Sequence, residues 1–133
     1  MRARDALGRH VPADSPAAVE PVSEQALPPE AALTLAQQLL DAGRAFSAHE
    51  VLEAVWKASP PQERDYWQGL AQLCVGVTHC QRGNREGAVT LLRRGAGHLS
   101  GPLVTWATAE ADRLERAERF EQEEVPQLRL RGS

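Results

Sequence analysis

One apolar seam constrains the fold of this chain more than any other feature. Along it, apolar residues recur at steps of four, three, four and three, the spacing that lines one face of an α-helix. The seam consists of Tyr66, Leu70, Leu73, Val77 and Cys80. Trp67, Ala71 and Cys74 add a second apolar flank. We therefore expect a long helix over residues 62–82 that is buried on most sides.

Shorter helical patterns lie on both sides of this seam. They predict helices over residues 30–42, from Ser47 to about residue 58, from Asn84 to about residue 99, and over residues 104–124. Gly43 and the Gly83-Asn84 pair are placed to end the helices that precede them. Ser47 and Glu50 have the spacing of a capping box, with Phe46 able to contact Val51 as a hydrophobic staple.

The fold class follows from these patterns. No segment has the alternation typical of a strand, and 133 residues suit one domain. We predict an all-α, single-domain bundle of about five helices with antiparallel neighbours. The helical domain covers residues 29–125. A flexible N-terminal tail (1–28) precedes it, because that stretch lacks apolar content, and a C-terminal tail (126–133) follows, with residues 125–128 returning as an extended segment.

Composition excludes several classes of function. The net charge is −3 with scattered basic residues, which argues against general nucleic-acid binding. No apolar run approaches the roughly 20 residues that span a bilayer, and the N-terminus lacks the apolar stretch of a secretory signal. We expect a cytoplasmic protein, and the prevalence of Arg and Ala indicates a GC-rich bacterial genome.

The two cysteines are expected to be reduced and structural. Cys74 and Cys80 fall six residues apart in one predicted helix, which places their Cα atoms about 9 Å apart, too far for a disulfide. Their spacing also differs from that of a zinc site.

A group of polar residues interrupts the apolar pattern of the second and third predicted helices. On the second helix, a His, a Glu and a Trp share one side, and on the third helix two Gln and a His share another. If these helices pack antiparallel, the two sides can face each other. The candidate pocket comprises His49, Glu53, Trp56, Gln68, Gln72 and His79.

Three interpretations of this pocket remain open. His49, Glu53 and His79 could bind a divalent transition metal with water in an open position. The same residues could form a metal-free acid–base site, because a carboxylate orients a neighbouring imidazole and raises its pKa. Alternatively, the group is a structural hydrogen-bond network. Whether the protein is an enzyme is left open.

Two known metal motifs are excluded. His49-Glu50-x-x-Glu53 has Glu where the zinc-protease signature requires a second His. A di-iron bundle needs Glu-x-x-His pairs on two helices, and the central helix has no carboxylate beyond its first turn.

Several motifs in the same order resemble one known family. They are Gly43 to Trp56, the stretch Tyr66-Trp-Gln-Gly-Leu-Ala-Gln-Leu, His79, and Arg82-Gly-Asn followed by Gly87-Ala88. Together they resemble the bacterial and archaeal domain-of-unknown-function family 309, over about residues 33–99. The resemblance implies a small, all-helical, cytosolic protein, and it implies no reaction.

A helical interaction module is the main rival to a ligand-binding protein or enzyme. The stretch from Gly83 to Ala96 resembles one antiparallel helix pair of a tetratricopeptide repeat, although no repeat of period 34 is present. Such a module would bind a protein partner or a second copy of itself.

Overall fold

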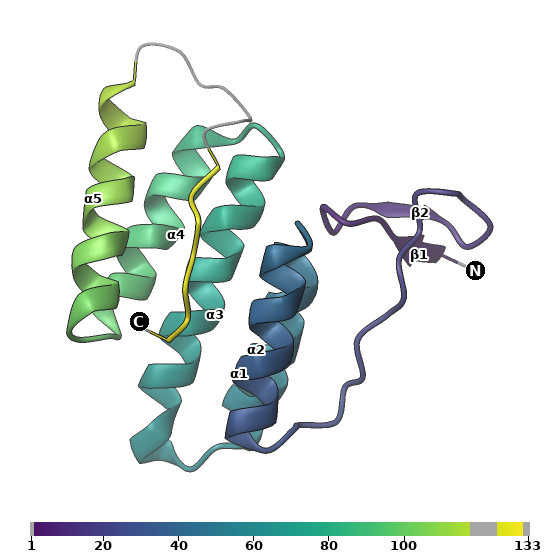
Figure 1. The fold of residues 1–133 in the computed structure, drawn as a ribbon, viewed down its shortest axis with the longest axis horizontal. Helices are drawn as coiled ribbons and strands as arrows, with labels where there is room; N and C mark the ends of the chain where they lie inside the picture. The colour runs from purple at the N-terminus through teal and green to yellow at the C-terminus, as the bar shows by residue number, and fades with distance from the viewer. Residues whose placement is uncertain (1, 118–124, 132–133) are drawn as a thin grey trace.

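A computed structural model describes residues 2–117 and 125–131 of the chain. Five helices make up most of it, as predicted, and Figure 1 shows them side by side. They are α1 (Pro29–Asp41), α2 (Ala45–Ala58), α3 (Pro61–Gln81), α4 (Arg85–Gly97) and α5 (Pro102–Arg116). The predicted all-α class and helix number are confirmed.

Each helix packs against the next one in the sequence, and neighbours run antiparallel. The short connections between them leave no other simple arrangement. The seam of α3 lies near the centre, where Leu70, Leu73 and Cys80 are fully buried. Tyr66 is the exception in this seam, because it lies at the exposed start of α3 and is 41% accessible.

The turns that end α1 and α3 have the same structure. Gly43 and Gly83 adopt φ angles of 77° and 78°, which suit glycine. After each glycine, the next residue donates to a carbonyl five positions back: Arg44 N–H to Leu39 O at 2.7 Å, and Asn84 N–H to His79 O at 2.8 Å. Both helices therefore end in Schellman motifs.

The similarity extends into the helices that follow, with a spacing of forty residues. Ala48 in α2 corresponds to Ala88 in α4, and Leu52 corresponds to Leu92. All four side chains are completely buried. The pairs α1–α2 and α3–α4 thus share a turn and two buried positions at a spacing of forty residues, which is near the period of HEAT repeats and longer than the 34 residues of tetratricopeptide repeats.

The predicted capping box at Ser47 is wrong. The helix α2 begins at Ala45, directly after the turn at Gly43, and no side chain caps it. Ser47 is therefore inside the helix, buried, with its hydroxyl accepting from Arg44 Nη2 at 3.1 Å. By contrast, the predicted cap at Asn84 is confirmed, because its side chain accepts from Gly87 N–H at 3.0 Å.

The expectation that no segment forms a strand is also wrong. Near the N-terminus, β1 (Arg2–Arg4) and β2 (His10–Pro12) pair as an antiparallel hairpin. The turn between them is built on Asp5, whose carboxylate accepts from the backbone N–H groups of Leu7 and Arg9. These local bonds explain how so short a hairpin forms, while the flexibility of residues 1–28 as a whole stays a prediction.

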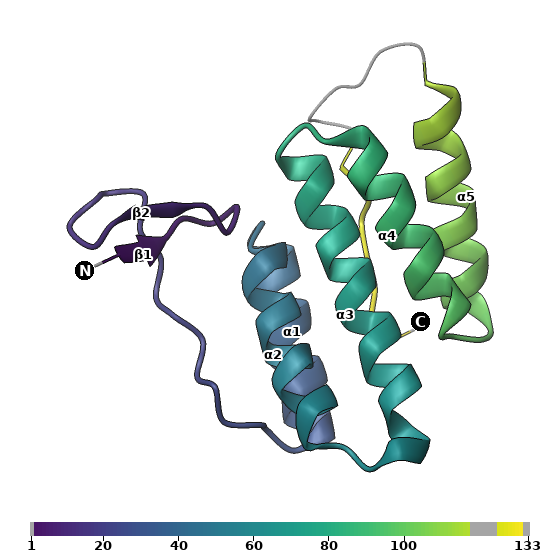
Figure 2. The ribbon, with the colours of Figure 1, turned by 180° about the vertical axis from the view of Figure 1, so that it is seen from behind.

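The predicted extended return of the chain after the last helix is present. The predicted helix to residue 124 ends earlier, at Arg116, and its remainder falls in residues 118–124, outside the described residues. Residues 125–131, here called the C-terminal segment, contain no helix. Figure 1 shows this segment in front of α3, between α1 and α5, and in Figure 2 it lies behind the helices.

The two cysteines are free and buried, as predicted. Burial raises the pKa of both thiols, and that of Cys80 to about 12, so neither is a nucleophile at neutral pH. Among the helices described here, none has the length and apolar character to cross a bilayer.

Candidate functional site

Two of the predicted pocket residues meet directly on α2. His49 Nε2 lies 2.7 Å from Glu53 Oε2, and Lys57 Nζ lies 2.9 Å from the other carboxylate oxygen. The hydrogen bond from Lys57 lowers the pKa of Glu53, partial burial opposes this effect, and the neighbouring His49 lowers the pKa further. Glu53 is thus an ionised acceptor that orients the ring of His49.

The second ring nitrogen of His49, Nδ1, does not share in this pairing with Glu53. In a neutral ring, a proton on Nε2 makes Nδ1 an acceptor. In the described part of the molecule, Nδ1 is buried and has no hydrogen-bond partner. The ring itself contacts Phe46 edge-on, with centroids 5.2 Å apart. The ring is therefore held by packing on one side and by Glu53 on the other.

The remaining pocket residues of α2 and α3 line the core instead of a shared cavity. Trp56 is partly buried and packs against the core cluster. Gln68 and Gln72 are half-buried on α3. The side-chain oxygen of Gln72 is buried without a partner among the described residues. Trp56 thus has a packing role, and Gln72, like His49, has one buried polar atom without a partner among the described residues.

His79 faces the start of α4. Its Nδ1 lies 3.1 Å from Asn84 Nδ2, and a methyl group at Gly87 would lie 2.8 Å from the same nitrogen. Burial, and then the charge of Arg82, lower the pKa of His79, so the ring is neutral at pH 7. These contacts tie His79 to the turn between α3 and α4.

The predicted metal trio is not gathered as a group. Within residues 2–117 and 125–131, no three His, Cys, Asp or Glu side chains lie close enough together to hold a metal ion. The structure brings His49 and Glu53 together, whereas His79 has its contacts at the turn before α4. A metal at His49, Glu53 and His79 stays a prediction.

The N-terminal hairpin lies against helix α2 near Phe46. Arg4 and Arg82 lie over the Phe46 ring, 4.7 and 5.7 Å from its centroid. The same two guanidinium groups donate to the carbonyls of Gly8 and Leu7, at 2.6 and 2.8 Å. A side chain at position 8 would overlap the Phe46 ring, so only glycine fits this contact.

Glu50 lies beside this hairpin and does not cap α2. It lines a cavity together with Arg4 and His10 from the hairpin and Ser47 from its own helix. Burial raises the pKa of Glu50, partly opposed by the neighbouring His49 and Arg4. Glu50 therefore faces this chain's own N-terminal segment.

A second site, which the sequence patterns did not predict, holds the C-terminal segment. Its residues alternate strictly: Pro126, Leu128 and Leu130 are buried, whereas the residues between and after them are exposed. This period of two is that of an extended strand lying on a surface. The alternation in Pro-Gln-Leu-Arg-Leu-Arg was a visible signal for it.

The surface beneath the segment belongs to α1 and α3 and is here called the α1–α3 surface. Leu128 shares a cavity wall with Leu40 of α1 and Val77 of α3. Leu130 lies beside Leu33 and Thr34, one turn from the start of α1. Because Leu128 lies near the end of α1 and Leu130 near its start, the segment runs antiparallel to this helix.

Comparison with known proteins gives one family match and one curated relative. Residues 33–91 match a family described as "Domain of unknown function (DUF309)". A relative from Bacillus subtilis (strain 168), "Uncharacterized protein YpuF", is 46% identical over 48 residues, which are 35% of this chain and 28% of the relative. No solved structure matches this chain. The hairpin and the C-terminal segment lie outside residues 33–91, the part of the chain that is similar to this family of unknown function.

Proposed function

We propose that this protein is an interaction module that binds an extended peptide segment on its α1–α3 surface. The observation that carries the proposal is the C-terminal segment, which lies on this surface in the manner of a bound peptide. Repeated helical hairpins commonly present one set of helices as an extended binding surface. Here α1 and α3 are the first helices of the two hairpins, and the segment lies across both.

One side chain of α1 contacts the backbone of the segment twice. Gln37 Nε2 donates to Leu128 O at 3.1 Å, and Leu130 N–H donates to Gln37 Oε1 at 2.9 Å. A side-chain amide can satisfy a strand backbone in this way because it offers a donor and an acceptor side by side. Such a pair holds any extended chain, whatever its side chains, and fixes its direction and register.

Two apolar anchors supply the remaining contact. Leu128 and Leu130 are 4% and 2% accessible, and full burial of a leucine is worth about 1.5–3 kcal/mol. The ordering of the segment opposes this gain, at about 1–2 kcal/mol for each residue fixed. Because this cost offsets the gain from burial, the segment is held weakly enough for a competing peptide to replace it.

The test uses the full-length chain with Leu128→Asp and Leu130→Asp together, which removes both anchors. A fluorescent peptide with the sequence of residues 125–131 is added, and its anisotropy is measured. We expect saturable binding to the double variant. Binding to the unaltered chain should be at least about tenfold weaker, because its own segment competes at an effective concentration of about millimolar.

The matched control is the same peptide with both leucines replaced by Asp, which should not bind. Far-UV circular dichroism shows whether the double variant keeps its helices, and Leu130→Ala replaces it if it does not. The proposal fails if the peptide binds either variant no better than the control peptide does.

A second candidate function is ligand or acid–base chemistry at His49. The 2.7 Å contact with Glu53 favours it, because an oriented imidazole is the usual metal ligand or base. A metal site at His49, Glu53 and His79 predicts stoichiometric metal in protein purified without a His tag, and its loss in His49→Ala. Metal analysis and a thermal shift with Zn, Mn or Ni test this, and the absence of both would reject it.

The proposal also includes a cytoplasmic location. Two free, buried thiols suit a reducing compartment, and the binding of nucleic acid is not part of the proposal because the net charge is −3.

A further inference from the structure

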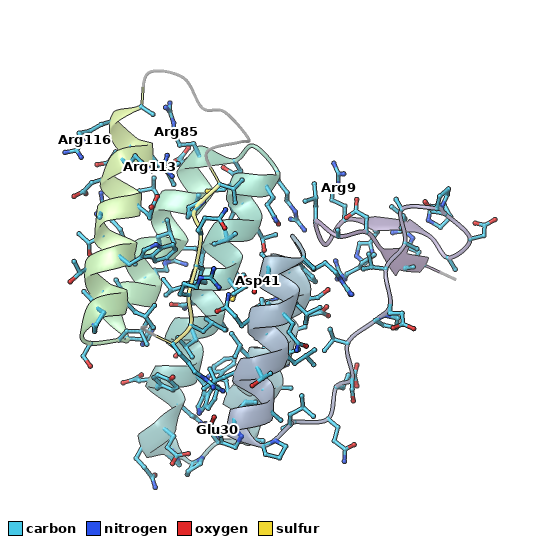
Figure 3. All side chains as sticks on the ribbon, in the orientation of Figure 1. Arg9, Glu30, Asp41, Arg85, Arg113 and Arg116 are labelled. Atoms are coloured by element: carbon cyan, nitrogen blue, oxygen red, sulfur yellow. The ribbon has the colours of Figure 1, made fainter. Side chains whose placement is uncertain are left out.

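Charged residues at both ends of α1 contact the C-terminal segment. Figure 3 shows Glu30 at the start of this helix and Asp41 at its end. Arg131 Nη2 lies 3.0 Å from Glu30 Oε2, and Arg129 Nη1 lies 3.6 Å from Asp41 Oδ1. Both exposed arginines of the segment therefore meet an acidic group of α1.

Arg131 has the more specific contact of the two. Besides the Glu30 carboxylate, its Nη2 donates to Glu30 O at 3.0 Å and to Thr34 Oγ1 at 3.4 Å. Three acceptors around one guanidinium define a small polar site at the start of α1, next to the place of Leu130. Arg129, at 3.6 Å from a single carboxylate, is a looser contact.

From this arrangement, and resting on the proposed function, we infer the chemical class of the partner. The α1–α3 surface binds extended segments of the pattern Leu-x-Leu followed directly by a basic residue, on a protein partner. The two leucines fill the places of Leu128 and Leu130, Gln37 holds the backbone between them, and the basic side chain reaches Glu30 and Thr34. The chain's own C-terminal segment is then a built-in competitor that such a partner displaces.

The pattern is set by geometry and by charge together. The spacing of two between leucines follows from the extended backbone, in which alternate residues face one side. The antiparallel direction along α1 follows from the two hydrogen bonds of Gln37, which accept and donate in a fixed order. The basic residue follows from complementarity, since an acidic residue there would lie beside Glu30.

The experiment compares peptides on the Leu128→Asp, Leu130→Asp full-length variant. All peptides carry the sequence of residues 125–131 with an amidated end, so that no terminal carboxylate lies near Glu30. We expect Arg131→Glu in the peptide to weaken binding about fivefold or more, since reversal replaces an exposed ion pair with repulsion. Arg129→Glu should weaken it less, and raising the salt concentration should reduce the difference.

A compensating variant tests whether the basic residue of the peptide contacts Glu30. Adding Glu30→Arg to the protein should restore binding of the Arg131→Glu peptide and weaken binding of the unaltered one. If all peptides bind equally well, the surface binds extended peptides, but the inference that the partner carries a basic residue after its two leucines is wrong. If no peptide binds, the proposed function itself is wrong. If light scattering finds two chains for the unaltered protein and one for the double variant, the segment of a second copy occupies the surface and the partner inference is overturned.

Discussion

Leu92→Ala is expected to lower the free energy of unfolding by about 2–5 kcal/mol. Leu92 lies on α4, is completely buried, and packs against α3 at Gly76, where an added methyl group would lie 3.0 Å from its Cδ2. Because the facing residue, Gly76, has no side chain, it cannot fill the space that the leucine leaves. Urea unfolding followed by circular dichroism measures the change.

Leu91 provides the matched control in the same helix. It is only half-buried, so the same substitution there changes helix propensity equally while removing little buried surface. Leu91→Ala should lower the free energy of unfolding by less than half as much as Leu92→Ala does. Equal losses at the two positions would show that α4 does not pack on α3 by this face.

The same methyl group should have opposite effects at two glycines of α4. At Gly95 it would lie 2.7 Å from Leu73 Cδ2 and 2.9 Å from Gly69 O. The carbonyl belongs to the backbone of α3 and cannot turn away, so the helices must separate. Such overpacking typically costs about 1–3 kcal/mol, and Gly95→Ala is therefore expected to destabilise the protein.

Gly97 is the comparison for this substitution. Among the residues that the structure describes, none has an atom within 4 Å of the added methyl group there, so Gly97→Ala should raise the free energy of unfolding by up to about 1 kcal/mol through helix propensity alone. Thermal unfolding of the two variants measures the difference. A stabilising Gly95→Ala would contradict the close contact between α3 and α4.

The number and order of the helices could be predicted because their signals are local. The seam of α3 repeats at helical spacing, and Gly43 and Gly83 mark the two Schellman turns. The sequence around these two glycines also shows a recurrence. Glycine, then an alanine five residues on, then a leucine four further on occurs twice, forty residues apart. A search at period 34 misses it.

The start of α2 was predicted wrongly because two local signals compete there. Ser47 and Glu50 have the spacing of a capping box, but the turn at Gly43 lets the chain re-enter a helix at Ala45. The hydrogen bond from Arg44 N–H to Leu39 O closes the Schellman turn, so α2 starts directly after it. Ser47 is then an interior residue of the helix.

The surroundings of the candidate sites could not be predicted, because they depend on contacts between distant residues. Arg82 binds Leu7 across 75 positions, and Leu130 binds Gln37 across 93. Helical periodicity carries no information about such pairs. It did identify the contact between His49 and Glu53, which are one turn apart on the same helix.

The exchange rate of the Leu130 amide tests most directly whether the C-terminal segment is a replaceable ligand of the α1–α3 surface. In isotopically labelled, full-length protein, this N–H should be protected from exchange, because it donates to Gln37 Oε1 and its residue is buried. The protection should be lost in Gln37→Ala, and also when an excess of unlabelled peptide of residues 125–131 displaces the segment. Exchange in the unaltered protein as fast as in an unstructured peptide, or protection unchanged by the added peptide, would contradict this account.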